Sequence, residues 1–204
     1  METPNWYFTI EIPLKSFMNM KNIEKLYDIR EGRHESISGV DYFASECYMI
    51  AFGVSVLEYE QKVKAAQQLR TWSMVWGDFH QEVIGLLPEW TSLGRGHETK
   101  CDNQKNDGTH VVELKNNKAT MNSDSQKSVM DKLKKQMDLG KRSTLVIMNG
   151  EASVTVKHGI EVMSGREFYG EITGRATFID DLLKTMKNIF TVYPTYKELK
   201  AGIP

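Results

Sequence analysis

The sequence predicts an α/β fold in which a mixed β-sheet is flanked by helices. Three observations support this fold class: a two-stranded hairpin pattern within residues 98–115, a compact apolar run at Ser143–Met148 that is typical of a buried strand, and helical patterns on both sides of these segments. Segments that alternate between helix and strand pack as layers, with helices covering a sheet.

The segments before the hairpin are predicted to be mainly helical. Periodicity and composition indicate, in chain order, a short strand at Trp6–Ile12, a helix at Met18–Ile29, a buried helix interrupted at Gly53 within Asp41–Val56, a helix at Leu57–Trp76, and a second helix at Asp78–Leu87 that ends before Pro88.

The segments after the hairpin complete the expected layers. A helix capped by Ser123, Asp124 or Ser125 runs to about Met137 and is closed by Gly140. The further expectations are a buried strand at Ser143–Met148, a strand at Val154–His158, a short helix entered through Ser164–Tyr169, and a final helix at Thr177–Val192.

The hairpin has a turn at Asn106-Asp107-Gly108, residue types that tolerate positive φ. Pairing about a centre near residue 107 places Glu113 opposite roughly residue 101 and Lys115 opposite roughly residue 98. Glu113 and Lys115 then share one face, whereas Val112 and Leu114 point to a core on the other.

The acidic and basic side chains of this hairpin suit a divalent metal and the water that it activates. Glu98 is expected at the start of the first strand, and Glu113 and Lys115 end the second. Asp102 is the alternative upstream carboxylate, and the pairing above favours Glu98. A Glu-x-Lys pattern alone occurs in many solvated strands, so the flanking residues decide its meaning.

Length and net charge limit the number of domains and the classes of function that the chain can have. A chain of 204 residues suits one domain, and its net charge of −1 excludes a uniformly basic nucleic-acid binder. Residues 95–142 carry 11 Lys/Arg and 7 Asp/Glu, a net of +4, which leaves −5 for the rest. The excess fits a phosphate-binding face, and a solvated helix of mixed charge explains the same counts. The run Lys132-Leu-Lys-Lys135 is interpreted in the same two ways, as a phosphate-binding surface or as a solvated helix face.

The two cysteines, Cys47 and Cys101, provide neither a disulfide framework nor a zinc site. A reducing, cytoplasmic compartment is therefore expected. The N-terminus has no signal-peptide pattern, and no apolar run approaches the length of a membrane span.

Three blocks of the sequence resemble one family of type II restriction endonucleases, which includes enzymes cutting at GGNCC-type sites. The resemblance covers roughly Leu57–Leu183, and its blocks are Gly77-Asp-Phe-His-Gln-Glu-Val-Ile-Gly85 with Trp90-Thr-Ser-Leu-Gly-Arg-Gly96, Glu113-Leu-Lys-Asn116 with Thr120-Met-Asn-Ser123, and Gly165-Arg-Glu-Phe-Tyr-Gly-Glu-Ile-Thr-Gly174. The sequence departs from the family pattern where Glu98 replaces an Asp and where Asn117 and Ala119 replace a Lys and an Asn.

The resemblance implies a PD-(D/E)XK nuclease core, which we expect over residues 57–204. Residues 1–56 match none of the family blocks, and we expect this N-terminal segment to pack on the core. The implied activity is Mg²⁺-dependent, sequence-specific hydrolysis of double-stranded DNA that leaves 5′-phosphates. Glu98 and Glu113 would hold one or two Mg²⁺ ions as hard oxygen ligands, with the Leu114 carbonyl completing the shell. Lys115 would orient the attacking water, and Glu82 would add a helix carboxylate.

The resemblance also implies contacts and partners. DNA contacts are expected from Asn116, Lys118, Asn122 and Ser123, just past the site. A symmetric DNA site implies a homodimer, and protection of host DNA implies a separately encoded DNA methyltransferase. His80 is read as packing rather than phosphate-binding, and His110 as a cross-strand neighbour.

Two alternatives share this fold. One is a non-specific or repair-type nuclease, and the other is a DNA-binding relative that has lost catalysis. Discrete fragments from a digested plasmid distinguish a specific nuclease from a non-specific one, and metal-dependent cleavage excludes the inactive relative.

Overall fold

The computed structural model describes residues 12, 14–33, 41–94, 96–117, 123–151 and 154–202. Most of the strand expected at Trp6–Ile12 lies outside these residues. Among the helices described, none combines the length and apolar character needed to cross a lipid bilayer.

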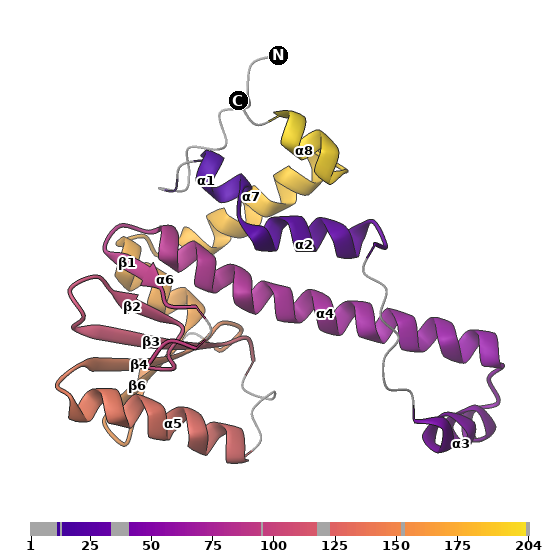
Figure 1. The fold of residues 1–204 in the computed structure, drawn as a ribbon, viewed down its shortest axis with the longest axis horizontal. Helices are drawn as coiled ribbons and strands as arrows, with labels where there is room; N and C mark the ends of the chain where they lie inside the picture. Colours follow the sequence, from indigo (N-terminus) through magenta and orange to yellow (C-terminus); the bar gives the residue numbers. More distant parts are fainter. Residues whose placement is uncertain are drawn as a thin grey trace.

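A mixed sheet forms the centre of the described chain (Figure 1). Its strand order is β1-β2-β3-β4-β6-β5, with β3, β4 and β6 parallel and the other pairs antiparallel. The strands are β1 (Trp90–Ser92), β2 (Asn103–Lys105), β3 (His110–Lys115), β4 (Arg142–Ile147), β5 (Val154–Lys157) and β6 (Ile160–Ser164). The predicted α/β class with a mixed sheet is confirmed, and β1 and β6 are additions that the sequence reading missed.

Helices cover both faces of this sheet. Their bounds are α1 (Leu14–Met18), α2 (Lys21–Arg30), α3 (Tyr42–Phe52), α4 (Val56–Leu86), α5 (Ser123–Asp138), α6 (Gly165–Thr173), α7 (Phe178–Val192) and α8 (Tyr196–Gly202). The helices expected near residues 123–137 and 177–192 are confirmed as α5 and α7. The helix expected at Met18–Ile29 is confirmed as α2, which begins three residues later at Lys21, and the short helix α1 before it was not expected.

One long helix, α4, replaces the two helices expected at Leu57–Trp76 and Asp78–Leu87. It begins at a capping box in which Ser55 and Glu58 satisfy each other's backbone N–H groups. Gly77 was expected to separate two helices, but a glycine costs a helix interior only about 1 kcal/mol. Burial of Val75, Phe79 and Val83 on the core side outweighs that cost.

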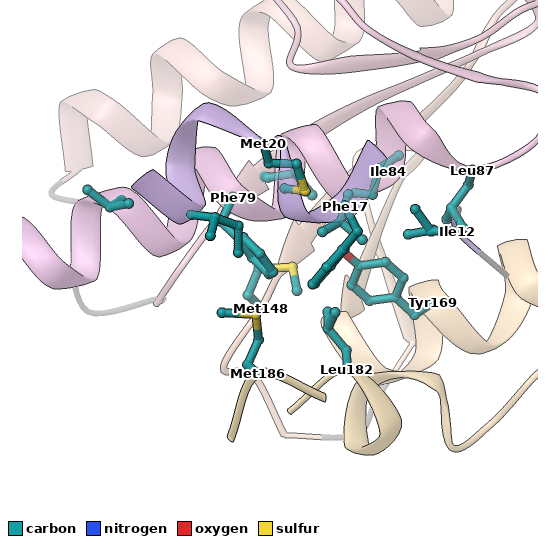
Figure 2. Packing of buried hydrophobic residues seen from close by; sticks show 14 of the residues in the cluster. Ile12, Phe17, Met20, Phe79, Ile84, Leu87, Met148, Tyr169, Leu182 and Met186 are labelled. Atoms are coloured by element: carbon teal, nitrogen blue, oxygen red, sulfur yellow. The ribbon is translucent and has the colours of Figure 1, made fainter. Parts of the chain in front are cut away.

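The larger core lies between the sheet and the helices α1, α2, α4, α6, α7 and α8. Phe17, Phe79, Tyr169, Leu182 and Met186 converge there from four different helices (Figure 2). A second core packs α5 on the opposite face through Val129 and Leu133 against β3 and β4 residues such as Val111 and Leu145. Figure 1 shows α5 on the side of the sheet away from α4. Strand β3 is therefore covered on both faces.

The helix α3 differs from its expectation. Its apolar composition predicted a buried helix, but Tyr42, Phe43, Ile50 and Phe52 are exposed, and Ser45 is the buried residue of the helix. Figure 1 shows α3 under the first turns of α4, apart from the sheet and the other helices. Apolar composition alone does not fix which surface covers a helix.

His110 makes the fold sensitive to acid. Its Nε2 lies 2.8 Å from Thr144 Oγ1 on the neighbouring strand. Burial, helped by the positive charge of Arg142, lowers the pKa of His110 to about 4. The native state therefore binds fewer protons than the unfolded chain between pH 6.5 and 4, so stability present above pH 6.5 is lost as the pH falls.

We expect His110→Gln to flatten this dependence, because glutamine keeps a hydrogen-bonding group near Thr144 and does not titrate. Between pH 7 and pH 5, the free energy of unfolding should fall by about 2 kcal/mol less in the variant than in the wild type. Urea unfolding at the two pH values measures this difference. Equal losses in both proteins would contradict the assignment.

Candidate active site

The site is built on the carboxyl end of β3. The turn before β3 closes as predicted, with Gly108 at φ 76° and its N–H donating to the Lys105 carbonyl over 2.8 Å. Strand β3 then runs parallel to β4, pairing Glu113 with Leu145 and Lys115 with Ile147. The carboxyl ends of two parallel strands thus lie side by side, where open α/β sheets place their ligands.

The register of the hairpin brings Asp102, rather than Glu98, to Glu113. Asn103 pairs with Val112, so continuing by one residue sets Asp102 opposite Glu113. The expected register, which placed Glu113 opposite residue 101, was wrong by one residue. The Asp102 N–H donates to the Val112 carbonyl over 3.0 Å, and its Oδ2 accepts the Leu114 N–H at 2.7 Å.

Glu98 lies in the loop before β2 and is exposed. The expectation that it begins the first strand was wrong, because β2 begins at Asn103. A compact turn removes residues 97–100 from the ladder: Lys100 has φ 57°, and its N–H donates to the His97 carbonyl over 2.9 Å. Residues 97–100 are not paired with β3, so their side chains do not follow the strand alternation.

Glu113 is a buried carboxylate held by two lysines. Its side chain is 3% exposed, and its Oε1 lies 2.5 Å from Lys115 Nζ. Its Oε2 forms an ion pair with Lys132 of α5. Lys132 also donates to the Lys100 carbonyl at 2.6 Å, which ties α5 to the turn beside Asp102. Burying a charge to this degree is costly unless it is paired, so the two lysines stabilise the Glu113 carboxylate.

Asp102 is affected by the same cluster. Burial and then the negative charge of Glu113 raise the pKa of Asp102 to about 6, although the Leu114 N–H and the two lysines favour its charged form. Two carboxylates this close to each other compete for the same positive charge. A bound cation would relieve that repulsion.

The residues present fit a hard divalent cation. Glu113 Oε2 is buried and has no hydrogen bond, despite its ion pair with Lys132. The Leu114 N–H faces Asp102, so the carbonyl of the same residue shares that edge of β3. The described residues contain no group of three or more His, Cys, Asp and Glu side chains around one point. Two carboxylates are nevertheless sufficient for Mg²⁺, which keeps several waters and takes phosphate oxygens from its substrate.

The structure does not bring Glu82 to this cluster. Its Oε2 accepts a hydrogen bond from the Asn22 N–H at 3.3 Å, so the side chain faces α2. His80 is partly buried and lines the cleft on α4, with Nδ1 3.1 Å from the Tyr169 hydroxyl, and desolvation lowers its pKa to about 4. A neutral imidazole in that position does not attract phosphate.

Of the four residues expected to contact DNA, Asn116 and Ser123 lie within the described residues. Asn116 donates its side-chain amide to the Ser73 carbonyl on α4, and Gly77 lies against it, since a Cβ there would be 3.2 Å from Asn116 Nδ2. Ser123 is exposed at the first turn of α5. Lys118 and Asn122 lie outside the described residues.

A cleft adjoins the cluster on the α4 side. It has a volume of about 1040 Å³ and is walled by α4, α7 and the carboxyl ends of β3 and β4. Polar side chains at its surface include Arg70, Lys115, Asn116, Asn149 and Arg166. Lys115 therefore lies between the buried Glu113 and an open space of a size that accepts a ligand.

Lys132 is the site residue that sequence reasoning left undecided. It stands in the run Lys132-Leu-Lys-Lys135, of which Leu133 is buried and Lys134 and Lys135 are exposed. The sequence feature that could have identified Lys132 is its position next to Leu133, at the edge of the apolar stripe of α5. The packing of α5 over β3 turns that position into a contact with Glu113.

These features define an α/β protein with paired carboxylates and lysines at the end of its central parallel strands. A family model described as Eco47II restriction endonuclease matches residues 36–193, well over half of the chain. The chain belongs to this restriction endonuclease family, and it is accordingly a nuclease by family. A comparison with curated proteins finds no match.

Replacing Lys132 tests the electrostatic reading of the cluster. We expect Lys132→Met to lower the free energy of unfolding by about 2 kcal/mol, because Glu113 loses one of its two ammonium partners. Lys134→Met is the matched control on the same helix, with an expected change of less than about 0.5 kcal/mol. Denaturant unfolding at neutral pH measures both, and equal stability of the two variants would refute the pairing.

Proposed function

We propose that this protein is a type II restriction endonuclease with a PD-(D/E)XK active site formed by Asp102, Glu113 and Lys115. The observation that carries the proposal is the hydrogen bond from the Leu114 N–H to Asp102 Oδ2. It positions a second carboxylate beside Glu113, next to the lysine that contacts Glu113 Oε1. The family match supports the same activity.

In this proposal Asp102 and Glu113 hold Mg²⁺, and the Leu114 carbonyl adds a third oxygen. When bound, the metal supplies charge neutralisation for the scissile phosphate and acidifies the attacking water. Asp102 replaces Glu98 as the upstream ligand because Glu98 is exposed outside the strand ladder. Glu82 has no part in this ligand set, since it bonds to α2.

Lys115 provides the positive charge at the reacting phosphate. Its ammonium is fixed by Glu113 Oε1 and borders the cleft, so it orients water and stabilises the negative charge of the pentavalent phosphorus. Lys132 pairs with the buried Glu113 carboxylate and positions it. Cleavage would leave a 5′-phosphate and a 3′-hydroxyl.

Double-stranded DNA would approach the cleft side of the β3 and β4 ends. Asn116, Lys118, Asn122 and Ser123 remain the proposed contacts to backbone and bases. A symmetric recognition site calls for a homodimer, and host DNA requires protection by a cognate methyltransferase encoded separately. These assignments place the enzyme in the cytoplasm, where its DNA substrate is found.

The paired variants Asp102→Asn and Glu98→Gln identify the upstream ligand. We expect Asp102→Asn to lower the rate of Mg²⁺-dependent plasmid cleavage by roughly a hundredfold or more, since a metal ligand matters at least as much as an outer-shell partner. Glu98→Gln should change it by no more than about twofold. Asparagine can still accept the Leu114 N–H, so the fold is preserved.

A second measurement is independent of activity. The rise in melting temperature on adding Mg²⁺ or Mn²⁺ should disappear in Asp102→Asn and persist in Glu98→Gln. The reverse result in both assays would restore Glu98 as the ligand. Metal-induced stabilisation that survives both substitutions would place the metal elsewhere.

Lys115→Ala tests the catalytic lysine. We expect cleavage to fall by roughly a thousandfold or more, while binding to DNA in Ca²⁺ stays within about tenfold, because the ammonium acts mainly on charge that develops in the transition state. Gel analysis of digested plasmid and a binding titration measure the two effects. Discrete fragments from the wild type support a specific endonuclease, whereas a smear supports the non-specific alternative.

A further inference from the structure

The ammonium group of Lys132 contacts two oxygen atoms of the kind that a hard metal cation takes as ligands. Its Nζ forms an ion pair with Glu113 Oε2 and donates to the Lys100 carbonyl oxygen at 2.6 Å. Carboxylate and backbone carbonyl oxygens are the usual protein ligands of hard divalent cations. Lys132 therefore places a positive charge where oxygen atoms from β3 and from the turn before β2 meet.

The turn at residues 97–100 presents the Lys100 carbonyl to Lys132. Lys100 has φ 57°, in a region that residues other than glycine adopt uncommonly. The turn is closed by the Lys100 N–H, which donates to the His97 carbonyl over 2.9 Å. The Thr99 hydroxyl lies 2.9 Å from His97 Nδ1 and accepts the Cys101 N–H at 3.3 Å. These bonds fix the direction of the carbonyl that receives the ammonium.

The charges of the cluster cancel before any metal binds. Asp102 and Glu113 contribute two negative charges, and Lys115 and Lys132 contribute two positive charges. The same two ammonium groups oppose the rise in the pKa of Asp102, so both act on each carboxylate. One divalent ion makes this set of groups net positive, and a second ion would double that charge. Buried groups are screened less than groups in water, so the second ion would be strongly repelled.

No third carboxylate compensates for a second ion among the described residues. They contain no group of three or more His, Cys, Asp and Glu side chains placed to hold a metal. Glu98 is exposed, and Glu82 accepts a hydrogen bond from the Asn22 N–H of α2. Two catalytic metal ions lie only about 3.5–4 Å apart, so their mutual repulsion calls for more negative charge than this cluster has.

We propose that Lys132 occupies the position of a second metal ion, so that the site holds a single divalent cation between Asp102 and Glu113. The inference rests on the proposed function, which assigns these two carboxylates to the metal, and it fixes how many ions they hold. Lys132 acts through Glu113 and is a positioning residue. Its ammonium is part of the chain, so the charge beside Glu113 Oε2 is present whether or not metal is bound.

The two lysines then have different roles on one carboxylate. Lys115 contacts Glu113 Oε1 and lines the cleft, where the proposed function places the scissile phosphate. Lys132 contacts Oε2 and is held on the α5 side by the Lys100 carbonyl. Replacing Lys132 should therefore change how the protein binds metal even when no DNA is present.

Titration calorimetry of the full chain with Mn²⁺, without DNA, is the test. We expect the wild type to bind one ion per chain. In Lys132→Met we expect this ion to bind roughly tenfold more tightly, because a positive charge a few ångströms away is removed. A second, weaker ion should also bind, because Glu113 Oε2 and the Lys100 carbonyl lose their cation. Electron paramagnetic resonance of free Mn²⁺ counts the bound ions independently.

Two variants control for charge and for position. Lys132→Arg keeps the positive charge and should bind one ion with an affinity within about threefold of the wild type. Lys134→Met removes an exposed lysine from the same helix and should titrate like the wild type. Circular dichroism confirms that all variants are folded.

The outcomes separate this inference from the proposed function. Two ions bound to the wild type would overturn the role of Lys132 and leave Asp102 and Glu113 as ligands. Lys132→Met that binds one ion with wild-type affinity would overturn it as well. Binding that persists unchanged in Asp102→Asn would instead refute the proposed ligand set, and the single-ion site would fail with it.

Discussion

The buried carboxylate of Glu113 is the constraint on which the rest of the site depends. A charge in the core of the sheet requires compensation, and the chain provides it from two elements, Lys115 at the end of β3 and Lys132 on α5. The ion pair between Lys132 and Glu113 holds α5 against β3, and it places a positive charge near Asp102. The cluster therefore stabilises the fold, and in the proposed function the same residues take part in DNA cleavage.

The sheet topology makes this cluster possible. Parallel pairing of β3 with β4 aligns two carboxyl ends, and the antiparallel pairing of β2 delivers Asp102 to the same edge. Burial, and then the negative charge of Glu113, raise the pKa of Asp102 to about 6.

The long helix α4 runs from the neighbourhood of α3 to the cleft beside Lys115. Its C-terminal half packs in the core and walls the cleft beside Lys115. Its first turns lie beside α3, which is apart from the sheet (Figure 1) and has exposed apolar side chains such as Phe43 and Ile50.

The sequence by itself determined the elements with strong local signals: the Asn106-Asp107-Gly108 turn, the strand carrying Glu113 and Lys115, the helices α5 and α7, and the family blocks that indicated a restriction endonuclease. Only the tertiary structure decided which acid meets Glu113, because one αL residue at Lys100 and a shift of one residue in pairing separate Asp102 from Glu98. It also decided the role of Lys132 and the exposure of α3. Both depend on which surfaces pack together, and local periodicity does not encode that choice.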